Sequence, residues 1–216
     1  MDISRSAALK RGARLEVVTI AWMAVEAAVA LGAGIGASSV LLTAFGVDSI
    51  IELLSGIVLY RRLVAEPGEA AVALARLEAR TTQISAVLLV LLCAYVLLSS
   101  VLGLVLKIIP SPSIPGLAVS AIAVVAMPLL ALGKVRVNRV LESASLRADI
   151  AETLSCAYLA GTTVAGLVVA MVTGWWWIEY VAALALLIWL IPEAREALED
   201  RRHNGASQRD KGRNNE

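Results

Sequence analysis

Residues 37–60 read ASSVLLTAFGVDSIIELLSGIVLY and are followed directly by Arg61 and Arg62. This stretch is almost entirely apolar and exceeds the length of about 20 residues that a helix needs to cross the hydrocarbon core of a bilayer. The two arginines end the apolar run, as basic residues do at the face of a membrane. The stretch therefore predicts a transmembrane helix.

The rest of the chain repeats this pattern. The composition is 59% hydrophobic and 17% charged, against about 45 to 50% and about 25% in soluble domains, and the mean hydropathy is +0.79. Five further apolar runs occupy residues 15–33, 83–108, 116–133, 147–173 and 176–193. We therefore expect an all-α membrane protein, a six-transmembrane-helix bundle.

The connections between these runs are too short to hold a second domain. We expect a leader over residues 1–14, one six-helix transmembrane domain over 15–195, and a polar tail over 196–216. The tail is poor in apolar residues, which predicts disorder.

The basic residues predict how the bundle is oriented. If the N-terminus is cytoplasmic, every Lys and Arg except Lys107 falls in a cytoplasmic segment or at its edge, as the positive-inside rule requires. The tryptophans 175–177 and Tyr180 then form an aromatic belt at the outer face. We expect both termini in the cytoplasm and a multi-pass protein of the cell (plasma or inner) membrane.

Composition also excludes several classes of function. The net charge of +1 gives no basic surface for nucleic acid. The single histidine, His203, lies in the polar tail, so serine–histidine hydrolysis and histidine-rich zinc catalysis lack their central residue. Cys93 and Cys156 fall in separate spans and form no disulfide framework. We expect a protein that is not an enzyme.

Acidic residues inside the spans are the strongest functional signal. They are Glu26, Asp48, Glu52, Asp149, Glu152 and Glu179, and we expect no Lys or Arg at the same depth. A charge at the centre of a spanning helix costs about 2.5 to 3.5 kcal/mol on insertion scales. These carboxylates must therefore be protonated, hydrated or neutralised by a cation from outside.

Helical spacing groups some of these residues on two faces. Asp48 and Glu52 are four residues apart, so they share one face of their helix. Asp149, Glu152 and Cys156 are spaced i, i+3 and i+7 and share a face of the fifth span. Counted at about 1.5 Å per residue from the cytoplasmic ends, the two faces meet near mid-membrane.

Structural roles compete with the ligand role for several of these residues. Asp149 lies near the start of its helix, where an acid interacts favourably with the helix dipole. Glu26 could hydrogen-bond in protonated form to a neighbour, and Glu179 could lie at the outer interface or line an exit path. Cys156 could be a small core residue, which is the role we expect for Cys93.

Two stretches resemble the second and fifth spans of the cation diffusion facilitator family. They are GVDSIIELLSGIVLYRRL (46–63) and SLRADIAETLSCAYLAG (145–161), and the resemblance extends over about residues 15–195. It implies metal ligands at Asp48, Glu52, Glu152 and Cys156. The family's fifth span often has His and then Asp where this chain has Glu152 and then Cys156, so the resemblance implies that one of the family's ligands is changed or absent here. The family also commonly has a cytoplasmic domain after the sixth span, so a homodimer of this chain would be held by membrane contacts.

Three carboxylates and a thiolate suit zinc best among the divalent metals, with manganese, iron or cobalt as further possibilities. Ligands lose protons when they bind metal, so we expect proton-coupled efflux of a transported metal and no permanently bound cofactor. Two alternatives use the same acids. One is a proton or monovalent-cation channel, and the other is a non-transporting membrane subunit whose acids pair with basic residues of a partner.

Overall fold

The computed structural model describes the backbone of residues 5–64 and 70–213, and the side chains of 5–64, 83–143 and 145–196. Six helices make up the described chain: α1 (Arg5–Ala37), α2 (Val40–Val64), α3 (Ala70–Leu106), α4 (Ile114–Leu141), α5 (Ala144–Thr173) and α6 (Trp177–Arg213). Each contains a stretch long and apolar enough to cross a membrane. The prediction of an all-α, six-helix membrane protein is confirmed.

The helices extend past the ends that the sequence predicts. α1 begins at Arg5, so most of the expected leader 1–14 continues the first span as helix, and α4 runs eight residues past 133 to Leu141. The backbone of α6 is helical through Arg213, where the sequence favours a disordered tail. The run EAREALE at 193–199 consists of strong helix formers, and an existing helix adds such residues without a new nucleation cost.

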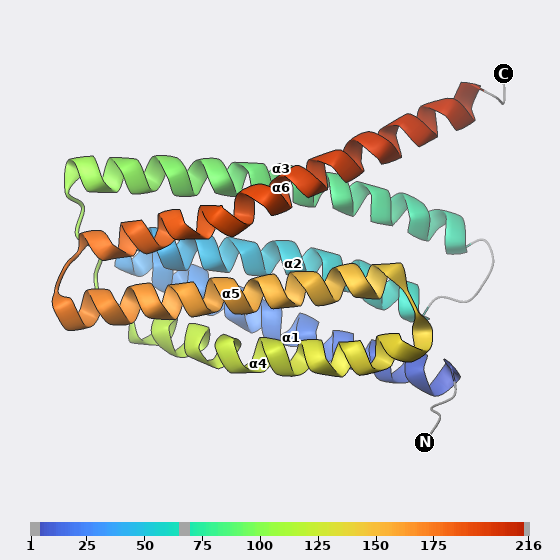
Figure 1. Cartoon of the computed structure of the whole chain (residues 1–216), viewed down its shortest axis with the longest axis horizontal. Helices are drawn as coiled ribbons and strands as arrows, with labels where there is room; N and C mark the ends of the chain where they lie inside the picture. Colours follow the sequence, from blue (N-terminus) through green and yellow to red (C-terminus); the bar gives the residue numbers. More distant parts are fainter. Residues whose placement is uncertain (1–4, 65–69, 214–216) are drawn as a thin grey trace.

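The six helices form two groups (Figure 1). Helices α1, α2, α4 and α5 pack together, while α3 and α6 lie side by side and cross. α2 contacts α1, α3, α5 and α6, and 56% of its most apolar stretch is buried, against 28–33% in the other five helices. The two acids of α2 are therefore carried by the central helix of the bundle.

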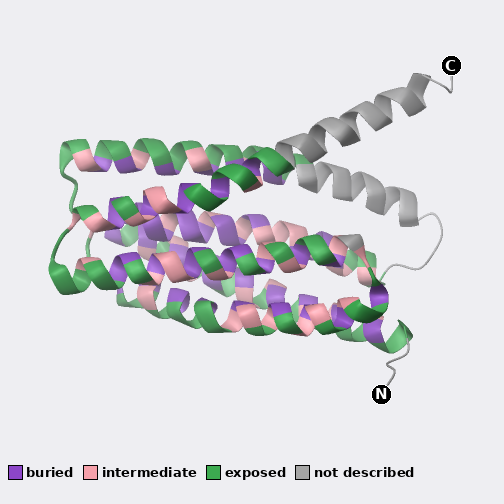
Figure 2. Cartoon of the chain, viewed as in Figure 1, coloured by how far each residue is buried: buried purple, intermediate pink, exposed green. Residues whose placement is uncertain are grey.

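The outer surface of the bundle is apolar. Exposed residues follow the outward faces of the helices (Figure 2), and many of them are Val, Leu and Ile, such as Leu98, Val125 and Ile188. Such a surface is unfavourable in water and is the surface that lipid tails cover.

Short turns keep consecutive helices antiparallel. Between α1 and α2, Ser38 adopts the left-handed conformation (φ 53°), and Ser39 N–H donates to the carbonyl of Gly34 at 2.8 Å. The Ser39 hydroxyl accepts from the N–H of Leu42 at 3.1 Å, which satisfies a free donor at the start of α2. Between α5 and α6, Gly174 takes the left-handed position (φ 70°).

Glycines let α1 and α2 approach closely. A Cβ atom on Gly34 would lie 2.7 Å from the backbone nitrogen of Thr43, and one on Gly46 would lie 2.8 Å from that of Leu31. Small residues at a helix interface allow such backbone contact in membrane proteins. This contact fixes α2 against α1 two residues before Asp48.

We therefore predict that Gly46→Ala destabilises the protein by about 1 to 3 kcal/mol, because the added methyl group forces α1 and α2 apart. The matched control is Gly32→Ala in α1, where a Cβ atom meets nothing within 4 Å. Unfolding of the purified protein by denaturing detergent, followed by circular dichroism, measures the difference. Equal stability of the two variants would contradict the close packing.

Candidate metal site between α2 and α5

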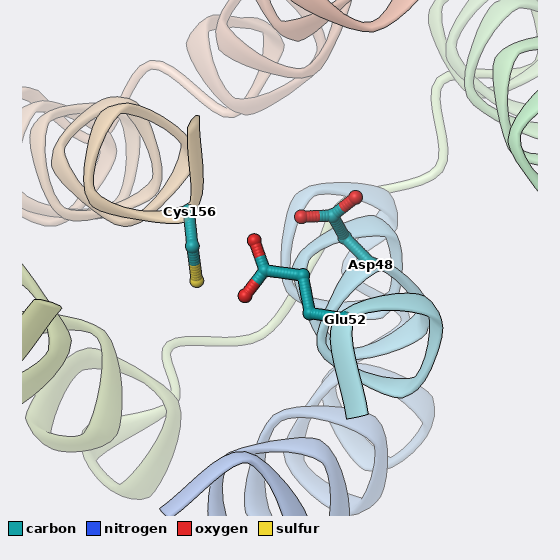
Figure 3. Close-up of side chains that lie close together, drawn as sticks. All are labelled: Asp48, Glu52 and Cys156. Carbon is teal, nitrogen blue, oxygen red and sulfur yellow. The ribbon is translucent and has the colours of Figure 1, made fainter. Parts of the chain in front are cut away.

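Three predicted ligands come together between α2 and α5. One ligand atom each from Asp48, Glu52 and Cys156 lies within 4.8 Å of the other two. Figure 3 shows the Glu52 carboxylate between the sulfur of Cys156 and the carboxylate of Asp48. Asp48 and Cys156 are 4% and 0% exposed, and Glu52 is half-buried. The predicted faces of the second and fifth spans do meet.

The donor atoms of this group suit a divalent transition metal. Zinc binds carboxylate oxygen at about 2.0 to 2.2 Å and thiolate sulfur at about 2.3 Å. Ligand atoms around one tetrahedral ion are therefore about 3.4 to 3.6 Å apart. Small side-chain rotations would bring the three donors to that spacing, with one coordination position left for another donor.

Glu152, the other predicted ligand, lies beside the group of three and outside it. Its Oε1 accepts a hydrogen bond from the Ser55 hydroxyl at 3.3 Å. The side chain is half-buried, one turn before Cys156 on α5, and Ser55 lies one turn after Glu52 on α2. The structure therefore places Glu152 next to the site, held by a residue of α2.

Asp149 is separated from the site by an ion pair. Lys134 Nζ in α4 donates to Asp149 Oδ2 at 2.6 Å, and it also lies 3.2 Å from Glu16 Oε1 in α1. The Thr153 hydroxyl is a further acceptor for Lys134 at 3.3 Å. The negative charge of Asp149 thus has a cation from the chain itself, and this residue does not join the group of three.

The expectation of no Lys or Arg at the depth of the acids is wrong. Lys134 and Glu16 are both 0% exposed, and sequence reasoning missed both. Signals were present, because Glu16 falls within the predicted run 15–33, and the apolar residues Val135, Val137 and Leu141 continue the fourth span past Lys134. Including them in the span would have placed a cation inside it, in need of a partner.

Glu26 is buried against the site from α1. It is 0% exposed and accepts hydrogen bonds from Trp22 Nε1 at 2.6 Å, Ser49 Oγ at 2.7 Å and Cys156 Sγ at 3.4 Å. A hydrogen-bonding role in the protonated form was one expectation for Glu26. The structure shows Glu26 hydrogen-bonded as an acceptor and gives it a partner in the site.

The remaining acids and the second cysteine lie outside the group of three. Glu179, expected at the interface, is 5% exposed and hydrogen-bonds to Ser39. Cys93 packs against the hydrophobic core, as predicted. Glu193 in α6 was not among the predicted sites, yet one of its carboxylate oxygens is buried without a hydrogen-bond partner.

No protein-family model matches this chain, and no curated protein is similar to it.

We predict that Lys134→Met destabilises the protein by about 3 to 5 kcal/mol, the usual cost of removing one partner from a buried ion pair. Glu16 and Asp149 would then lose their shared cation. The matched control is Arg136→Met, which removes an exposed charge from the same helix.

Thermal unfolding in detergent compares these variants. Adding Glu16→Gln and Asp149→Asn to Lys134→Met should recover most of the lost stability, because no uncompensated charge remains. A Lys134→Met variant as stable as Arg136→Met would contradict the ion pair.

Proposed function

We propose that this chain is a divalent metal transporter that moves its substrate out of the cytoplasm in exchange for protons. The observation that carries the proposal is the group of Asp48, Glu52 and Cys156, buried between two helices of a bundle with six candidate membrane spans. Carboxylates at membrane depth are costly unless they are neutralised, and a mobile cation would supply that neutralisation. The resemblance of residues 46–63 and 145–161 to the cation diffusion facilitators supports the same function.

The donor set favours zinc as substrate. Two carboxylate oxygens and one thiolate sulfur combine hard and soft ligands, which suits zinc and cobalt better than manganese or magnesium. The metal is cargo and leaves the site at each cycle. We therefore propose transport rather than catalysis, with no permanently bound cofactor.

Proton exchange follows from the chemistry of the ligands. Carboxylic acids and thiols must lose their protons to bind a metal ion. Loading of the site then releases protons, and their return from the other side favours release of the metal. Alternating exposure of this single site to the two faces of the membrane would couple the two fluxes.

We also propose how the protein is oriented in the membrane and that it forms a homodimer. Both termini are cytoplasmic in the cell membrane, as the distribution of Lys and Arg favours. Two copies associate through their lipid-facing helices.

The orientation predicts which positions react with a membrane-impermeant maleimide in intact cells. In a Cys93→Ser background, a cysteine in place of Ser111, between α3 and α4, should react directly. A cysteine in place of Arg139, near the end of α4, should react only after the membrane is permeabilised. Both residues are exposed. The reverse pattern would show that the bundle is inserted the other way.

Transport itself is tested in proteoliposomes with an imposed pH gradient and a panel of divalent metals. We predict saturable, gradient-dependent uptake of zinc that falls about tenfold or more in Asp48→Asn, which removes the charge of one ligand, and in Cys156→Ala, which removes the sulfur. Glu152→Gln should have a smaller effect, since Glu152 lies beside the group. Glu179→Gln is the control, a buried acid away from the site.

Folding and insertion of each variant are checked by gel filtration and by circular dichroism. If correctly inserted wild-type protein moves none of the metals under any gradient, the transporter proposal fails. Flux of protons or monovalent cations without saturation would indicate a channel instead.

A further inference from the structure

We propose that Glu26 is a positioning residue that orients the sulfur of Cys156 toward the metal position. The inference rests on the proposed function and adds a third helix, α1, to a site that the sequence assigns to α2 and α5. Its basis is a set of hydrogen bonds around one fully buried carboxylate.

Cys156 donates in a different direction from four hydroxyl side chains of α5. Thr153, Ser155, Thr162 and Thr173 each donate to the carbonyl four residues earlier in the same helix. This back-bonding is the usual local option for a small polar side chain in a helix. Cys156 instead donates across to Glu26 Oε1 in α1, at 3.4 Å.

Glu26 is itself held in place by two stronger donors. Trp22 Nε1 donates to Oε2 at 2.6 Å, and the Ser49 hydroxyl lies 2.7 Å from Oε1. Trp22 is one turn before Glu26 in α1, whereas Ser49 is next to Asp48 in α2. One carboxylate therefore connects α1 to the ligand-bearing helices on both sides of the site.

This arrangement determines which way the Cys156 side chain points. A cysteine in a helix has two accessible χ1 rotamers, and the thiol is a weak donor. In the metal-free protein the S–H that Cys156 donates to Glu26 favours the rotamer that places the sulfur in the group with Asp48 and Glu52. The sulfur therefore already points to the metal position when its proton is released on metal binding. Residues that orient metal ligands in this way change metal affinity about 10- to 100-fold when they are replaced.

Cobalt binding to the purified full-length chain tests the proposal, because thiolate coordination produces a sulfur-to-cobalt charge-transfer absorption that carboxylates do not produce. The titrations use a Cys93→Ser background, in which Cys156 is the remaining cysteine. The variants are Glu26→Leu, which removes the acceptor, and Glu26→Gln, which keeps an acceptor oxygen. Glu179→Gln is the control, and Cys156→Ser marks the absence of the sulfur band.

We expect Glu26→Leu to weaken cobalt binding about 10- to 100-fold and to lower the sulfur band relative to the d–d bands of the bound cobalt. Glu26→Gln should keep most of the sulfur band, and Glu179→Gln should match the parent. In the Cys156→Ser background, Glu26→Leu should cost little further affinity, because its effect acts through the sulfur. A role in folding alone would lower all bands together and would not depend on Cys156.

If Glu26→Leu retains the parent affinity and sulfur band, the positioning role is overturned while the metal site stands. If the parent protein itself binds no cobalt, the proposed function fails and this inference fails with it. Should Glu26→Leu not fold, the double variant Trp22→Phe with Ser49→Ala, which removes both anchoring donors, replaces it. A reduced sulfur band in that variant supports the proposal, and an unchanged band overturns it.

Discussion

The cost of burying a carboxylate away from water constrains the whole interior of this bundle. Several acids are buried within helices that can span a membrane, and each needs compensation. The structure provides it in different ways. Asp149 and Glu16 share the ammonium group of Lys134, and Glu26 accepts hydrogen bonds from three side chains. Asp48 and Glu52, on the central helix, lie beside Cys156, and for these residues we propose an exchangeable cation as the compensation.

Packing of the helices makes this division possible. Gly34 and Gly46 let α1 approach α2 to backbone contact, which brings Glu26 next to Ser49 and places α1 against the site. α4 and α5 are joined by a short turn and lie side by side, so Lys134 reaches Asp149 fifteen residues later in the chain. The ion pair and the candidate site thus lie along the same helix, α5. Lys134 compensates the charge of Asp149, whereas we propose that a transported cation compensates the charge of the site.

Much of the candidate site could be predicted from local spacing. Asp48 and Glu52 share a face because they are four residues apart, and Cys156 follows Glu152 by the same interval on α5. Spacing within one helix does not show which of several acids on one face come close to the ligands of the facing helix. Rotation and offset between α2 and α5 decide this, and they place Glu152 against Ser55. The pairing of Glu16 with Lys134 depends on a contact between distant segments, which spacing within one helix does not contain.

The sequence by itself determined the fold class, the number of spans and the two faces that carry Asp48, Glu52 and Cys156, because hydrophobic run length and helical periodicity are local properties. Only the tertiary structure decided which acid has which partner. Asp149 pairs with Lys134, and Glu26 bonds to Cys156, because side chains from two different helices must meet for either contact to form. The compensation of a buried charge is therefore a property of the packed bundle, whereas the presence of that charge is a property of the sequence.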